Sequence, residues 1–142
     1  MRVLGLDFGD KTVGVALSDP FGWSAQGIET IRRQDESDLK STISRLSKII
    51  AEYNAELIVL GYPKNMDNSE GLRCKKTVLF KKKLNENFPE LEVVLFDERL
   101  STVAAGRTLL EADLSRSKRK KIIDKIAAVF ILQNYLDSKS RN

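Results

Sequence analysis

An aspartate stands inside the apolar segment with which the sequence begins, MRVLGLDFGDKTVGVA. Side chains alternate between the two faces of a strand, so we expect Asp7 to share its face with Val3, Gly5 and Gly9, while the large apolar side chains point the other way. A buried carboxylate without a partner is costly in free energy. The rest of the sequence must therefore supply a cation, hydrogen-bond donors or a solvated cleft beside Asp7.

The length and composition are typical of one globular domain. The sequence has 142 residues, of which 42% are hydrophobic and 31% charged, enough to bury a core without disulfides. No apolar run approaches the roughly 20 residues that span a bilayer, and no signal-peptide pattern follows Met1. We expect a single cytoplasmic domain over residues 1–142.

Two amino acids that often carry catalysis are scarce or missing. Histidine is absent and Cys74 is the only cysteine, which excludes Ser-His-Asp and Cys-His catalysis, the usual zinc sites and an internal disulfide. Cys74 is expected to be a small buried apolar residue. Any catalysis would rest on carboxylates, Lys, Tyr, Ser or Thr, and most naturally on a hard cation bound by oxygen.

The spacing of apolar residues predicts an α/β fold. Strands are predicted at 2–8, 12–18 and 23–31 as an antiparallel meander, and at 56–63 and 91–96; helices are predicted from Asp35 with Ser37 or Asp35 as cap, at about 70–87, at about 101–113 and from about 121. The order β-β-β-α-β-α-β-α-α favours a five-stranded mixed sheet, the meander plus two parallel strands, with helices on both faces.

Three other acids could lie near Asp7. Asp97 and Glu98 follow an apolar strand and should face opposite sides, so only one of them can point at Asp7. Asp124 lies near the start of an apolar helix, on a face that carries Ala127 and Ala128, which allow a close approach to the sheet. Taken singly, each acid is explained by an ordinary strand end or helix start.

Taken together, these acids predict a metal site. Carboxylates that share a cleft repel one another, and a divalent metal relieves the repulsion. Two Mg²⁺ or Mn²⁺ ions about 4 Å apart, bridged by one carboxylate, would activate water and stabilise the leaving oxygen of a phosphodiester. The sequence thus favours phosphodiester hydrolysis without a side-chain nucleophile.

The positive charge is concentrated in two segments. The net charge is +4, with KKTVLFKKK at 75–83 and RSKRKK at 116–121 holding much of it. We interpret the first segment as the solvated face of a helix and the second as a contact for phosphate, because its charges repel one another unless an anion is present.

Four stretches resemble the YqgF family, also called RuvX: LDFGDKTVGVALSD, GYPKNMDNSEG, FDERLST and IDKIAAVFILQNYLD. The resemblance implies an RNase H-like fold and a metal-dependent nuclease that acts in 5′-end maturation of pre-16S ribosomal RNA. It also implies that Asp7, Glu98 and Asp124 are the catalytic, metal-binding acids. The expected contacts for substrate are Lys11, Lys64, Asn65, Arg99, Arg116, Lys118 and Arg119.

Several alternatives stay open at the level of sequence. Family members are also described as Holliday junction resolvases by likeness to RuvC, so branched DNA competes with RNA as the substrate. The first stretch also resembles the phosphate loop of the actin, Hsp70 and sugar-kinase ATPases, in which Asp7 would hold the Mg²⁺ of ATP. A non-catalytic RNA-binding assembly factor is the third alternative, and the protein could be a monomer or a homodimer.

Overall fold

The computed structural model describes residues 1–63, 71–97 and 116–140, without the side chains of 116–124 and 140. One sheet has the strand order β3-β2-β1-β4-β5. β1 pairs antiparallel with β2 and β2 with β3, whereas β4 lies parallel to both β1 and β5. The strands are β1 (Arg2–Phe8), β2 (Thr12–Ser18), β3 (Ala25–Arg32), β4 (Ala55–Tyr62) and β5 (Glu92–Asp97), and the helices are α1 (Leu39–Tyr53), α2 (Leu72–Asn87) and α4 (Arg116–Ser140). The predicted mixed sheet is confirmed.

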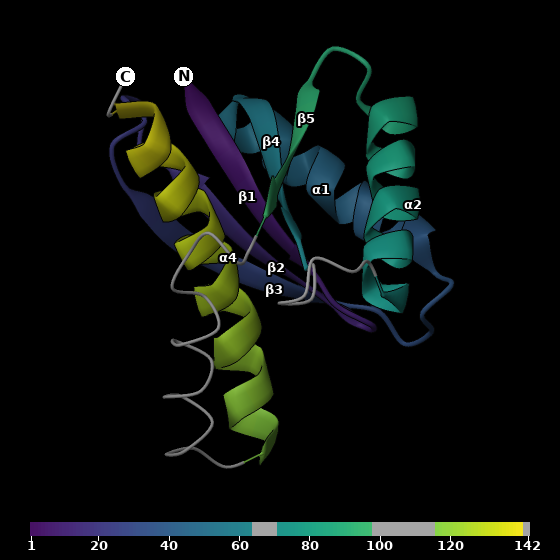
Figure 1. The fold of residues 1–142 in the computed structure, drawn as a ribbon. Helices are drawn as coiled ribbons and strands as arrows, with labels where there is room; N and C mark the ends of the chain where they lie inside the picture. Colours follow the sequence, from purple (N-terminus) through teal and green to yellow (C-terminus); the bar gives the residue numbers. More distant parts are fainter. Residues whose placement is uncertain (64–70, 98–115, 141–142) are drawn as a thin grey trace.

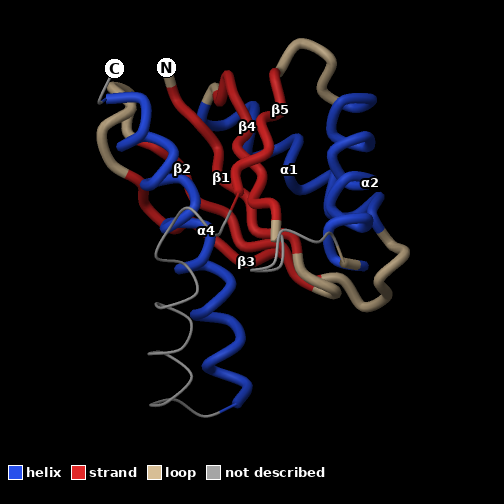
Figure 2. Tube along the Cα trace, in the orientation of Figure 1, coloured by secondary structure: helices blue, strands red, loops and turns tan. Residues whose placement is uncertain are grey.

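The sheet is the middle layer of three. Figure 1 shows α1 and α2 on one side of the strands and α4 on the other, and Figure 2 shows the same layers by secondary structure. α4 contacts β1, β2 and β3, and α1 and α2 both contact β4. Helices therefore cover both faces, as the order of elements predicts.

Side-chain alternation in β1 divides the core into two clusters. Leu4 and Leu6 are fully buried in the cluster beneath α1 and α2, together with Phe80. Val3 belongs to the cluster beneath α4, which includes Ala128 and Leu132. The odd-numbered positions of β1 thus face α4, so the predicted direction of the Asp7 side chain is confirmed.

α4 packs closely on β1 because the strand has a glycine at the point of contact. A Cβ atom placed on Gly5 would lie 2.7 Å from Cβ of Leu132 and 3.2 Å from the carbonyl oxygen of Ala128. Ala127 and Ala128 are buried, 1% and 0% exposed. The expected close approach, with small residues on both sides, is confirmed.

Two helix boundaries differ from those predicted. α1 is capped by Asp38, whose carboxylate accepts from the backbone N–H of Ser41, and not by Ser37 or Asp35. The reason is local, because Oδ1 of Asp35 already accepts from the N–H and hydroxyl of Ser37 in a turn before the helix. α4 already includes Arg116, before the predicted start near residue 121, since Arg and Lys favour helix and nothing in RSKRKK interrupts it.

The structure also tests the predicted strands, the second predicted helix and the expected burial of Cys74. The predicted strands and the helix at 70–87 are confirmed to within about two residues. Cys74 is buried on α2, 1% exposed, as expected. The helix predicted at 101–113 lies outside the described residues. Within the described part of the chain, no helix combines the length and apolar character needed to cross a membrane.

Candidate active site

Asp7 lies near the carboxyl end of the central strand, β1, and has a glycine beside it on each neighbouring strand. It is 4% exposed, and its partner on β2 is Gly14. On the other side Leu6 pairs with Leu60 of β4, so the residues that follow them, Asp7 and Gly61, lie at the same level of the sheet. The carboxylate is therefore flanked by bare backbone on both neighbouring strands.

The parallel strands β4 and β5 end at the same edge as β1. Phe96 of β5 pairs with Gly61 and makes an edge-to-face contact with Tyr135 of α4, with ring centres 6.3 Å apart. Phe96 therefore shares the α4 face with Asp7. Asp97 follows it and lies on the opposite face of the strand, by alternation.

α4 runs antiparallel to β1. Oε1 of Gln133 accepts from the N–H of Ala25 at the start of β3, 2.9 Å away, whereas Lys125 would contact a Cβ placed on Gly27, two residues further along β3. β3 and β1 run in the same direction, because both pair antiparallel with β2. The beginning of α4 thus points toward the edge at which β1 ends, and Figure 1 shows the end of α4 beside the start of β1.

This direction brings position 124 toward Asp7. Ala128 packs over Gly5, and position 124 lies one helical turn nearer the start of α4. Along β1, Asp7 is two residues beyond Gly5 in the same direction. The backbone of α4 therefore approaches the Asp7 end of β1, but the side chain of Asp124 lies outside the described part of the structure.

Most of the predicted site residues fall outside what the structure describes. Glu98, Lys64, Asn65 and Arg99 lie outside the described residues, and Arg116, Lys118 and Arg119 lie in α4 without described side chains. Among the side chains that the structure does describe, no group of three or more Asp, Glu, Cys or His residues could hold a metal ion. The three-acid metal site stays a prediction.

Lys11 is the described member of the predicted substrate contacts. It is exposed in the turn between β1 and β2, where the N–H of Gly9 donates to the carbonyl oxygen of Thr12 at 2.7 Å and the carbonyl oxygen of Lys11 accepts from the N–H of Arg33 at 2.7 Å. The turn carrying Lys11 is thus fixed by backbone hydrogen bonds just beyond Asp7.

Arg33 is the residue near the site that sequence reasoning missed. Its side chain is buried, 2% exposed, and its Nη2 atom donates to the carbonyl oxygens of Gly9 and Asp10 at 2.7 and 2.5 Å. Burial lowers the pKa of the Arg33 guanidinium, although Glu36, Asp10 and Asp38 act in the other direction. The signal in the sequence was slight, since Arg32 ends β3 and Arg33 follows it directly, and alternation only indicates that the two side chains point to opposite sides.

Lys76 of α2 joins the same turn to the segment before α1. Its ammonium group lies 3.0 Å from a carboxylate oxygen of Glu36 and 3.5 Å from one of Asp10. The hydrogen bond to Glu36 raises the pKa of Lys76. The first basic segment is thus partly engaged in ion pairs and otherwise forms an exposed helix face, in agreement with its interpretation as a solvated surface.

Comparison with known proteins gives the family. A model of the RuvX family, described as Holliday junction resolvase, matches residues 1–138. The chain belongs to the RuvX family. RuvX relatives from Staphylococcus epidermidis and Staphylococcus aureus, both named "Putative pre-16S rRNA nuclease", are 56% and 54% identical to it over 137 residues, 96% of this chain and 96% of each relative. The resemblance of the four sequence stretches is confirmed.

Solved structures with low sequence identity share the fold of this RuvX chain. RuvC of T. thermophilus in complex with a Holliday junction substrate aligns with a TM-score of 0.63 and 11% identity, over 99% of this chain and 96% of RuvC. The Holliday junction resolvase of fowlpox virus aligns with a TM-score of 0.51 and 17% identity, over 97% and 99% of the two chains. The RNase H-like fold implied by the resemblance is confirmed.

Proposed function

We propose that this RuvX chain is a metal-dependent nuclease that hydrolyses phosphodiester bonds in the 5′-end maturation of pre-16S ribosomal RNA. The observation that carries the proposal is the buried carboxylate of Asp7, beside Gly14 on the neighbouring strand. Burying a carboxylate is costly in free energy, and its oxygen atoms are suitable ligands for a hard cation. The names of the staphylococcal relatives support nuclease activity and ribosomal RNA as the substrate.

The proposed metal ligands and catalytic acids are Asp7, Glu98 and Asp124. Asp97 faces away from α4, which favours Glu98 over Asp97 as the acid from β5. The direction of α4, with position 124 toward the end of β1, supports Asp124. Three carboxylates and no histidine form a donor set of oxygen atoms, which suits Mg²⁺ or Mn²⁺.

The proposed chemistry divides between the ions and the protein. Two bound ions would supply an activated water and stabilise charge on the leaving oxygen. The protein would hold the acids at fixed positions, and Gly14 and Gly61 place no side chain beside Asp7. Lys11 is exposed on the turn beyond Asp7, where its ammonium group could contact a phosphate of the substrate. The basic start of α4 would do the same through Arg116, Lys118 and Arg119.

The decisive experiment is cleavage of a defined precursor RNA by Asp7→Asn in Mg²⁺ or Mn²⁺. The expected result is loss of cleavage with retained or stronger binding, because the variant removes one negative charge from the site and leaves its shape. Asp10→Asn is the matched control, since Asp10 is exposed in the following turn, and it should cleave like the original protein. Equal cleavage by Asp7→Asn would overturn the site, and binding without cleavage by the original protein would favour a non-catalytic assembly factor.

A second candidate substrate is a four-way DNA junction. The description of the family model and the structural likeness to junction-bound RuvC favour it. Cleavage of a synthetic junction and of the precursor RNA should be compared at equal concentration with the same Asp7→Asn control. The RNA proposal requires faster cleavage of RNA, and preferential cleavage of the junction would replace it.

A further inference from the structure

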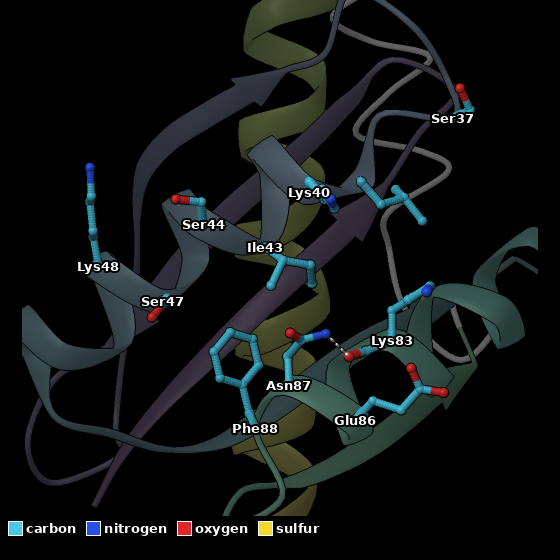
Figure 3. A pocket seen from close by; sticks show the side chains of 11 residues that line it. Ser37, Lys40, Ile43, Ser44, Ser47, Lys48, Lys83, Glu86, Asn87 and Phe88 are labelled. Atoms are coloured by element: carbon cyan, nitrogen blue, oxygen red, sulfur yellow. Dashed lines mark hydrogen bonds between the residues drawn. The ribbon is translucent and has the colours of Figure 1, made fainter.

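A groove of about 780 Å³ lies between α1 and α2, on the side of the sheet away from α4. Figure 3 shows its two walls, with Lys40, Ser44 and Lys48 on α1 and Lys83 on α2. Phe88, which is buried, lies between the helices. The groove is therefore separate from the proposed acidic site, which faces α4.

The charge of this groove is positive. Lys40, Lys48 and Lys83 are exposed, and Glu86 is the single acid among the described residues that line it. Within the described part of the chain, none of the three lysines forms an ion pair, in contrast to Lys76 with Glu36. Three ammonium groups are thus available to an anionic ligand.

Hydroxyl groups on α1 add neutral donors to the same wall. Ser44 and Ser47 are exposed, and their side chains make no hydrogen bond to any other described residue. Two nearby serines differ from Ser44 and Ser47, because their hydroxyls already donate to carboxylates: Ser37 to Asp35 at 2.8 Å and Ser41 to Asp38 at 3.1 Å. The hydroxyls of Ser44 and Ser47 are therefore free to donate to a ligand.

Lysine ammonium and serine hydroxyl groups are typical contacts for nucleic-acid phosphates. Lys40 and Lys48 are separated by eight residues of helix, or about 12 Å, which is long enough for more than one phosphate. A volume of about 780 Å³ is typical of sites for small ligands, which matches the backbone of one strand between the two helices better than the width of a duplex. We propose that the groove binds the sugar–phosphate backbone of a single-stranded part of the substrate RNA, away from the bond that is cleaved.

A second pocket extends the groove toward the turn that follows Asp7. This pocket, of about 260 Å³, shares Ser37 and Leu39 with the groove and reaches Gly9 and Asp10, in the turn after β1. A strand held between α1 and α2 can therefore follow this path to the edge of the sheet where Asp7 lies. The inference deepens the proposed function and rests on it, because it names a second contact for the same RNA.

The test compares two double variants, each of which removes two positive charges from the protein. Lys40→Ala with Lys83→Ala changes one lysine on each wall of the groove. Lys75→Ala with Lys82→Ala changes two exposed lysines of α2 that line neither the groove nor the second pocket. Binding of a single-stranded RNA from the precursor is measured by fluorescence anisotropy between about 50 and 200 mM salt, without divalent metal, so that cleavage plays no part.

The groove variant should bind about tenfold more weakly, and its slope of log affinity against log salt should fall by about 1.4, or about 0.7 for each lost phosphate contact. The control variant should keep both values close to those of the original protein. Cleavage in Mg²⁺ of an RNA too short to reach the groove should be equal in all three proteins.

Four results would overturn the inference. Equal losses in the two double variants would mean that total charge, and not the groove, attracts RNA. A groove variant that keeps its RNA affinity but loses binding of an oligoglutamate peptide would assign the groove to an acidic protein segment. If the original protein binds RNA but the groove variant binds it equally well, only this inference fails, whereas an original protein that binds no RNA contradicts the proposed function as well.

Discussion

The guanidinium carbon of Arg33 lies 4.7 Å from the centre of the Phe8 ring. From this position Nη2 of Arg33 donates to the carbonyl oxygens of Gly9 and Asp10, while Phe8 stacks on Phe80 of α2. The end of β1 is therefore held from the α1 and α2 side, and the Asp7 side chain faces α4. The side chain that fixes the turn is on one face of the sheet, and the proposed chemistry is on the other.

Arg33→Met should lower the free energy of unfolding by about 1 to 3 kcal/mol, because the carbonyl oxygens of Gly9 and Asp10 lose their donor. Urea unfolding measures the change. Arg32→Met is the control, since Arg32 is the exposed neighbour of Arg33 at the end of β3, and its effect should stay within about 0.5 kcal/mol. Equal effects of the two substitutions would contradict the role of Arg33.

Gly5→Ala should lower the free energy of unfolding by about 1 to 3 kcal/mol, because the new methyl group meets Leu132 and the backbone of Ala128. Gly27→Ala should cost less, since its methyl group meets the flexible side chain of Lys125. Combining Gly5→Ala with Leu132→Gly should cost less than the sum of the two single changes, because the new methyl group meets Cβ of Leu132 and glycine lacks that atom. Additive losses would show that the contact with Cβ of Leu132 is unimportant.

Tyr135 should make the protein less stable in alkaline solution. Burial raises the pKa of the Tyr135 phenol, with a smaller contribution from Glu92. Because the folded pKa lies above the unfolded value, this group's contribution is fully present below the unfolded pKa, near 10, and is lost as the pH rises through the folded pKa. Urea unfolding from neutral pH to about pH 11 should therefore show a smaller fall in stability for Tyr135→Phe than for the original protein. Parallel curves would contradict the assignment.

Mg²⁺ should stabilise the protein through the proposed acids. A ligand that binds only the folded state at a hundredfold excess over its Kd adds about 2.7 kcal/mol to the free energy of unfolding. Thermal unfolding with and without Mg²⁺ should show a shift for the original protein and for Asp10→Asn, and a much smaller shift for Asp7→Asn. An equal shift in Asp7→Asn would place the ion elsewhere, whatever the result of the cleavage assay.

The sequence predicted the sheet well because its signals are local. The alternation in LGLDF correctly gave the direction of Asp7, and the short turn at 9–11 required an antiparallel pair. Ala127 and Ala128 correctly indicated the helix face that approaches the sheet. These patterns follow from the geometry of single elements, and the resemblance to RuvX then gave the fold that joins them.

Features that depend on competition between neighbouring groups were harder to predict. The predicted cap of α1 was wrong because the side chains of Asp35, Ser37 and Asp38 can all form hydrogen bonds at a helix start. In the structure Asp38 caps the helix, and Asp35 accepts from Ser37 instead. The burial of Arg33 depends on carbonyl oxygens from a distant turn, which no local pattern reveals. The acids beyond Asp7 remain predictions, since Glu98 and the side chain of Asp124 lie outside the described residues.

The order of the elements along the chain has a consequence for synthesis on the ribosome. α4 is the last described element, and it covers Val3, Ala16 and Val59 on the face of the sheet that carries Asp7. While translation continues, the earlier strands can emerge and pair, but α4 cannot cover that apolar face until residues 127–136 have left the exit tunnel. The nascent chain would thus expose those apolar side chains to aggregation before α4 emerges, and position 124 of the proposed site would reach Asp7 only then.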